Sequence, residues 1–221
     1  MARVLEALRD LAARITGHVL AFVVRLVAAP RVIWDQGGPL ARQRVYFANH
    51  TSNADLPLIW TVLPGDLRVR TRPVAAADYW LKNPVRKFFG GDVFRGLLVD
   101  RRPEARDEGE DPMATIRGAL DAGDSLIIFP EGRRNETKKT LLPLKAGIYN
   151  MALSHPEVEM VPVWIENLNK VMPRGEVVPI PLICTIAFGR PLPPPEEGEE
   201  KDDYLRRACK ALLDLRRESA A

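Results

Sequence analysis

Apolar residues recur along the chain in two patterns, one typical of helices and one typical of buried strands. Between Val4 and Ala29 they return at close to the helical period, which predicts a long amphipathic helix at the N-terminus. Ser125 to Phe129 is a short, continuously apolar run, as in strands buried within a parallel sheet. Strand-like and helical segments then alternate, so the sequence predicts an α/β fold with a mostly parallel central sheet flanked by helices.

The same patterns give approximate positions for the individual elements. The predicted strands are Val45–Ala48, Leu67–Val74, Val93–Arg102, Ser125–Phe129, Val158–Ile165 and Leu182–Phe188. The predicted helices are Val4–Ala29, Leu56–Trp60, Asp78–Phe89, the segment from Asp111 to Gly123, Leu144–Leu153 and Tyr204–Arg217. Ser52 and Asn53 are suitable N-caps for the second of these helices. Asp111 and Pro112 fit the start of the helix that Gly123 should end.

The N-terminal helix has two interpretations. Its more apolar half, Ile15 to Ala29, is only fifteen residues long and carries His18 and Arg25, whereas a spanning helix needs about twenty apolar residues. We therefore expect residues 1–34 to form an amphipathic membrane-docking helix in the lipid interface, and residues 35–221 to form the main domain. The alternative is a helix packed on the protein's own core.

The length, cysteine content and net charge of the chain indicate which classes of protein fit the sequence. With 221 residues, 46% of them hydrophobic, the chain can build a core without metals or disulfides. Cys184 and Cys209 lack metal-ligand spacing and lie in apolar or helical surroundings, which predicts buried thiols, a reducing compartment and no metal site. The net charge of +3 is too mild for nucleic-acid binding, and no stripe of basic and aromatic residues is present.

Reactive side chains lie at the ends of three of the predicted strands or directly after them. They are His50 with Asp55, Asp100 with Arg101, and Glu131 and Gly132 with Arg133 and Arg134. Ligands of open α/β sheets bind beyond the carboxyl ends of the strands, so we expect these groups to meet there. Within one helix, a five-residue separation would turn His50 and Asp55 about 140° apart, but a strand-to-helix turn can bring them together. Such a pair suits general-base catalysis, and a hydrogen-bonded turn histidine is the plainer alternative.

A serine nucleophile is a poor fit to this chain. Gly123-Asp-Ser125-Leu126 matches the signature of one class of serine esterases, but Ser125 precedes its strand and should lie at the opposite end of the sheet from His50. The histidine more naturally activates a hydroxyl group of the substrate. The arginines that follow the predicted strands favour a substrate that carries phosphate.

These residues also resemble a known family. His50-Thr-Ser-Asn-Ala-Asp55 has the H-x4-D form of glycerolipid acyltransferases, and three further blocks follow in the family's order. The blocks are Val93 to Arg101, which ends in an aliphatic-Asp-Arg step, Phe129-Pro-Glu-Gly132, and Val161-Pro-Val163. Most of the chain from Val45 to Arg190 is thus similar to bacterial 1-acylglycerol-3-phosphate acyltransferases.

The resemblance implies a reaction and a role for each matching residue. An acyl chain would pass from acyl-CoA or acyl carrier protein to the free hydroxyl of 1-acylglycerol-3-phosphate, giving phosphatidic acid. His50 would be the general base, oriented by Asp55. The glycerol phosphate would bind at Arg101, Glu131, Gly132 and Arg134, and Pro162 would belong to the acyl-donor block. Neither a cofactor nor a metal is required.

Other acceptors stay open at this point. They include a lyso-ornithine lipid, another lysophospholipid and glycerol 3-phosphate, and a catalytically inactive lipid-binding module is a hypothesis of a different class. Arg133 stands where the family usually has Thr or Ser, and Asn135 replaces its usual Ser. The extra cation at position 133 would influence which lipid headgroup the protein prefers. The expected partners are a lysophospholipid, the acyl donor and a membrane surface, and the expected location is the cytoplasmic face of the inner or plasma membrane.

Overall fold

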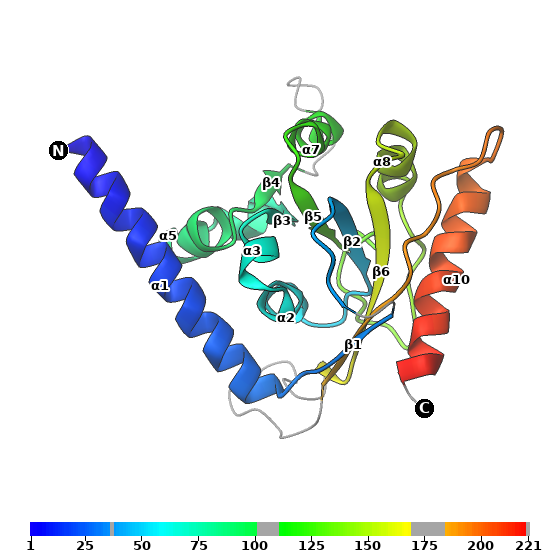
Figure 1. Cartoon of the computed structure of the whole chain (residues 1–221), viewed down its shortest axis with the longest axis horizontal. Coiled ribbons are helices and arrows are strands. Elements are labelled where there is room, and N and C mark those ends of the chain that lie inside the picture. Colours follow the sequence, from blue (N-terminus) through cyan, green and yellow to red (C-terminus); the bar gives the residue numbers. More distant parts are fainter. Residues whose placement is uncertain (36–37, 101–110, 169–183, 220–221) are drawn as a thin grey trace.

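A computed structural model of the protein describes residues 1–35, 38–100, 111–168 and 184–219. In these residues a seven-stranded sheet with the order β1-β7-β6-β2-β5-β3-β4 forms the centre, and helices lie on both sides of it (Figure 1). The strands are β1 (Arg31–Trp34), β2 (Arg44–Ala48), β3 (Thr71–Ala76), β4 (Leu97–Val99), β5 (Ser125–Ile128), β6 (Glu159–Glu166) and β7 (Thr185–Phe188). The helices are α1 (Ala2–Ala28), α2 (Asp55–Val62), α3 (Gly65–Arg68), α4 (Ala77–Trp80), α5 (Pro84–Lys87), the π-helical turn η1 (Phe88–Val93), α7 (Pro112–Asp121), α8 (Gly147–Ser154) and α10 (Lys201–Ser219).

The sheet is mostly parallel, which confirms the predicted fold class. β2 pairs in parallel with β5 and β6, and β3 pairs in parallel with β4 and β5. β7 runs antiparallel to β6, and β1 follows the direction of β7. β2 is therefore a central strand, and its carboxyl end lies beside those of β5 and β6.

Both faces of β2 are buried, which explains its continuous apolar run. Tyr46 and Ala48 belong to a core shared with α1 and α2. Val45 and Phe47 belong to a second core shared with α7, α8 and α10. Figure 1 shows the same arrangement, with α1 and α10 on opposite sides of the molecule. The alternation of side chains across a strand thus builds three layers, helix, sheet and helix.

Two of the predicted strands are shorter than expected. Leu67 and Arg68 belong to the helical turn α3, where the Arg68 guanidinium donates to the Leu63 carbonyl at 3.1 Å, and β3 begins only at Thr71. β4 begins at Leu97 because Arg95 adopts a left-handed conformation with φ of 52°, which no regular strand accommodates.

The capping predictions had mixed outcomes. Asp111 caps α7, since its Oδ1 accepts the Met113 N–H at 2.9 Å, and Gly123 ends that region with φ of 81°. The expectation that Ser52 or Asn53 caps α2 is wrong, because the helix begins at Asp55 behind Ala54. The chain ahead of α2 folds around the Asp55 carboxylate instead.

The boundary expected after residue 34 falls inside the sheet. β1, assigned above to the N-terminal segment, pairs with β7, and Trp34 stacks on Phe188 with ring centroids 3.8 Å apart. Four residues at a sheet edge carry too little periodicity to be separated from the helix that precedes them. The N-terminal segment that lies apart from the sheet is α1.

α1 confirms the predicted N-terminal helix and has two distinct apolar faces. Small residues, among them Ala13, Gly17 and Ala21, face α2 and η1, and a Cβ on Gly17 would lie 3.1 Å from the Trp60 ring. Larger apolar side chains on the other face are exposed: Val4, Leu5, Leu8, Leu11, Ile15, Val19, Phe22, Val23 and Leu26. One face packs on the core, as the alternative interpretation expected, and the other face is exposed, so membrane docking stays a prediction.

The length argument against a membrane crossing does not hold. Among the described residues, Arg3–Ala28 forms one helix that is long and apolar enough to span a membrane by length and composition alone. Its first half adds to the apolar length of the fifteen residues from Ile15 to Ala29. An orientation within the lipid interface stays a prediction.

Asn49 should contribute strongly to stability because its side chain joins β2 to β6. Its Oδ1 accepts the Ile165 N–H at 2.8 Å, and its Nδ2 donates to the Ile165 carbonyl at 3.0 Å, all in the core. Asn49→Ala should lower the free energy of unfolding by about 2–4 kcal/mol, since two buried backbone groups lose their partners. Asn53→Ala, at an exposed residue of the same loop, should change it by less than about 0.5 kcal/mol. Urea denaturation measures both, and equal values would contradict the role of Asn49.

Candidate active site

The turn between β2 and α2 brings His50 and Asp55 together. The His50 Nδ1 lies 2.8 Å from Asp55 Oδ2, and the same oxygen accepts the N–H groups of Thr51 at 2.7 Å and Ser52 at 2.8 Å. The Asp55 side chain is 0% exposed, whereas that of His50 is 20% exposed. A buried carboxylate therefore shapes the turn and leaves one side of the imidazole open.

The hydrogen bonds of Asp55 indicate which nitrogen of His50 carries the hydrogen. Asp55 Oδ2 accepts from two backbone N–H groups, so it faces the ring as an acceptor and Nδ1 is the donor. Nε2 then holds a free lone pair. The His50 ring also stacks on Phe129, with centroids 4.2 Å apart, which restricts its rotation. This is the geometry of a general base whose tautomer is set by a carboxylate.

The loop after β5 holds the backbone of His50 on both sides. Glu131 Oε1 accepts the His50 N–H at 2.8 Å, and the Asn135 N–H donates to the His50 carbonyl at 2.7 Å. The other Glu131 oxygen accepts the Leu142 N–H at 2.8 Å. Burial raises the pKa of Glu131 above its usual range, and the N–H groups of Leu142 and His50 oppose that rise. Both oxygens of Glu131 thus have backbone partners, and one of them holds the turn that carries His50.

The remaining predicted site residues differ in how they lie relative to His50. Gly132 adopts φ of 71° in the loop beside Glu131, and Arg134 pairs with the Glu136 carboxylate. Pro162 is buried in β6. It pairs with Phe47 of β2, which lies three residues before His50 along the chain. Arg101 lies outside the described residues. The binding roles of these residues stay predictions.

Three contributors to the site escaped the sequence analysis. Phe129 supports the imidazole face, Asn135 holds the His50 carbonyl, and Asn49 ties the end of β2 to β6. Phe129 opens the block that ends at Gly132, and Asn49 directly precedes His50, so their position along the chain was a usable signal. The contact of Asn135 uses its backbone N–H, which no side-chain pattern records.

Two potential nucleophiles are poorly placed for chemistry at His50. Ser125 is the first residue of β5, and its Oγ accepts the N–H of Arg44, the first residue of β2. It therefore lies at the amino ends of these strands, whereas His50 follows the carboxyl end of β2. Burial, aided by the negative charge of Asp55 and Glu166, raises the pKa of Cys184 to about 12. That thiol is therefore protonated at neutral pH and unreactive.

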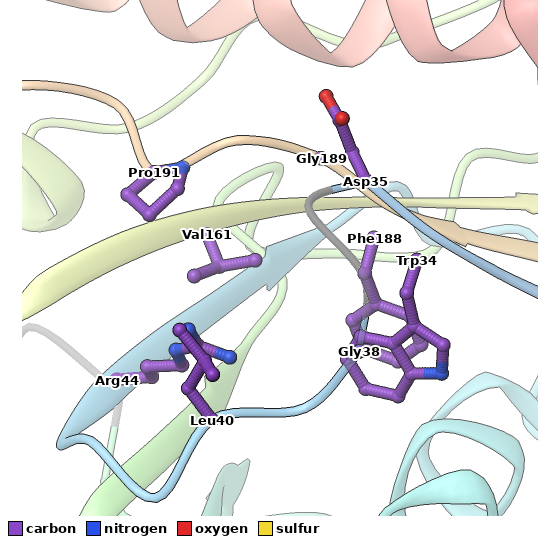
Figure 2. A pocket seen from close by; sticks show the side chains of 9 residues that line it. All are labelled: Trp34, Asp35, Gly38, Leu40, Arg44, Val161, Phe188, Gly189 and Pro191. Atoms are coloured by element: carbon purple, nitrogen blue, oxygen red, sulfur yellow. The ribbon is translucent and has the colours of Figure 1, made fainter.

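The hollows found in the described surface lie away from His50. One, shown in Figure 2, has a volume of about 10 Å³ and is lined by Trp34, Phe188 and Arg44 with their neighbours. That volume is roughly the space that one water needs. A second, of about 140 Å³, lies at the amino ends of β2, β3 and β5, beside Arg70 and Ser125. Neither of these two hollows is lined by a predicted site residue.

The described residues contain no group of three or more His, Cys, Asp or Glu side chains that could hold a metal ion. The arrangement is that of an α/β protein with a carboxylate-oriented histidine at the carboxyl end of a central parallel strand.

Comparison with known proteins assigns the chain to a family. The profile of the Acyltransferase family matches residues 32–166, which include both His50 and Asp55. The protein belongs to the Acyltransferase family.

Individual relatives agree with this assignment. The chain is 26% identical, over 84% of its length, to a 1-acyl-sn-glycerol-3-phosphate acyltransferase of Cocos nucifera, and 30% identical, over 67% of its length, to Taffazin of Dictyostelium discoideum. It spans only 60% and 53% of those two proteins. The fold is similar to that of the 1-acyl-sn-glycerophosphate acyltransferase PlsC of Thermotoga maritima, with a TM-score of 0.67 and 19% identity over 96% of this chain and 82% of that one.

Glu131 should affect turnover through the position of His50. In Glu131→Gln the amide offers one oxygen and one NH2 group, so an N–H of either His50 or Leu142 loses its acceptor. We expect kcat to fall at least roughly tenfold, because small displacements of a catalytic group are costly, with a smaller change in KM. Steady-state kinetics of purified protein measure this, with the exposed Glu157→Gln as the matched control. An unchanged kcat in a folded Glu131→Gln protein would contradict the positioning role.

Proposed function

We propose that the protein transfers an acyl chain from acyl-CoA or acyl carrier protein to the free hydroxyl of 1-acylglycerol-3-phosphate, with His50 as general base. The observation that carries this proposal is the 2.8 Å contact between His50 Nδ1 and the buried Asp55 carboxylate. Membership of the Acyltransferase family supports the reaction class.

The chemical step balances with His50 as the only proton carrier. Nε2 takes the proton of the acceptor hydroxyl while its oxygen attacks the thioester carbonyl carbon. The tetrahedral intermediate collapses, the C–S bond breaks, and the imidazolium returns the proton to the leaving thiolate. Asp55 stabilises the imidazolium through Nδ1 while it exists. The products are the ester and the free thiol, and no covalent enzyme intermediate forms.

The choice of acceptor rests on the relatives. The names of the coconut and Thermotoga proteins specify 1-acylglycerol phosphate as acceptor. The cationic residues near the loop after β5, including Arg133 and Arg134, suit a phosphate-bearing headgroup. Other lysophospholipids, a lyso-ornithine lipid and glycerol 3-phosphate are the alternatives that an acceptor panel would separate.

We further propose that α1 docks the enzyme on a membrane. Its outer face carries nine large apolar side chains exposed by 44–71%, an arrangement that gains free energy in a lipid interface. Arg3 and Arg14 are exposed on the same helix, where they can reach lipid headgroups. With two free cysteines in the described chain, the cytoplasmic face of the membrane is the side we expect.

The reaction mechanism predicts opposite outcomes for two substitutions. His50→Ala should lower acyl transfer by about 10²–10⁴-fold, because the general base is lost. Ser125→Ala should keep transfer near the wild-type level, since Ser125 lies at the other end of β5. Transfer of a labelled acyl chain from acyl-CoA to lysophosphatidate in detergent measures both, with melting temperatures as the check on folding. Loss of activity in Ser125→Ala, or wild-type activity in His50→Ala, would refute the mechanism.

The membrane proposal is tested on the free face of α1. Val19→Glu with Phe22→Glu removes two side chains that are 57% and 67% exposed. Vesicle binding should weaken at least about tenfold, given roughly 1.5–3 kcal/mol for each buried apolar side chain. Leu153→Glu on α8, at a residue exposed by 58%, is the control and should bind normally. Co-sedimentation with vesicles measures the affinity, and an unchanged value for the α1 variant would exclude this face as the docking surface.

A further inference from the structure

Lys145 lies directly against the loop that holds His50. A Cβ built on Gly132 would lie 2.5 Å from Lys145 Cε and 2.8 Å from its Nζ. The Lys145 N–H also donates to the Pro130 carbonyl at 2.8 Å. Both the backbone and the ammonium group of Lys145 are therefore docked on residues 130–132, and a side chain at position 132 would displace the ammonium.

This ammonium has no carboxylate partner in the described part of the chain. Glu131, the acidic residue next to Gly132, uses both of its oxygens to accept the N–H groups of His50 and Leu142. The Arg134 guanidinium, by contrast, is paired with Glu136. Lys145 is thus held next to the loop that contacts His50, and no carboxylate among the described residues pairs with its charge. Its side chain is exposed, so a ligand can reach it.

The position of the Lys145 ammonium suits a glycerol phosphate. The ammonium lies over Gly132, and the neighbouring residue Glu131 accepts the His50 N–H, so the same loop contacts both Lys145 and His50. In 1-acylglycerol-3-phosphate the reacting hydroxyl and the phosphate sit on adjacent carbon atoms. An acceptor whose hydroxyl reaches His50 therefore needs a cation close to His50, and a lysine acts on phosphate as a compact point charge.

We infer that Lys145 binds the phosphate monoester of the acceptor and sets the preference for phosphate-bearing acceptors. This inference rests on the proposed acyl transfer to a lysolipid, and it adds a residue that the sequence motifs did not mark. The absence of a side chain at position 132 is then the condition that lets the ammonium lie over the loop.

The test compares two acceptors that differ by the phosphate. Lys145→Met keeps most of the side-chain volume and removes the charge, and Lys145→Arg restores the charge. With lysophosphatidate, Lys145→Met should raise KM by about 10- to 100-fold at a nearly constant kcat, as expected for a lost charge-assisted contact. With monoacylglycerol, which lacks the phosphate, kcat/KM should stay within about threefold of wild type. Lys145→Arg should recover most of the affinity for lysophosphatidate.

Lys138→Met removes a charge from an exposed lysine of the same loop and should leave both acceptors unaffected. A binding measurement that is independent of turnover completes the design. Glycerol 3-phosphate, but not glycerol, should raise the melting temperature of the wild type, and Lys145→Met should lose that shift. An unchanged KM and melting shift in Lys145→Met, or an equal loss with both acceptors, would overturn the assignment. A wild type that transfers no acyl chain to any lysolipid would refute the proposed function, whereas the melting shift would still report on phosphate binding.

Discussion

The site depends on one buried carboxylate. Asp55 Oδ2 collects the N–H groups of Thr51 and Ser52 together with His50 Nδ1, while the side chain is entirely removed from solvent. A carboxylate is costly to bury unless it is compensated, and here the compensation comes from the turn that it folds. The same carboxylate therefore sets both the backbone conformation of the turn and the orientation of the His50 imidazole.

The rest of the fold presents that turn at a fixed place. The central strands β2, β5 and β6 run in parallel side by side, and Asn49 ties the end of β2 to β6. The loop after β5 holds the His50 backbone by its N–H and its carbonyl. Most of these contacts involve backbone groups, whose positions are set by the sheet. In the proposed reaction, the protein would contribute position and proton transfer, and the thioester of the donor would contribute the reactivity.

The sequence predicted the elements with strong burial patterns and missed those decided by tertiary contacts. β2, β5 and β6 were found because both faces of each are apolar, whereas β1 is a four-residue edge strand recognisable only through its pairing with β7. The pairing of His50 with Asp55 followed from their spacing across a turn. The contacts of Glu131 did not, because its partners are the backbone groups of His50 and of Leu142, eleven residues further along the chain.

The packing of α1 has a consequence for how the enzyme would approach its lipid. The helix lies close to α2, whose first residue is Asp55, and it is joined to the domain by the Arg25 contact to the Thr61 carbonyl and the Arg9–Asp92 ion pair. The small side chains of Ala13 and Gly17 set the spacing between the two helices. If α1 docks on a bilayer as proposed, side-chain size at these positions would set the distance between the lipid surface and the turn that carries His50, so bulkier residues there would move that turn away from the lipid.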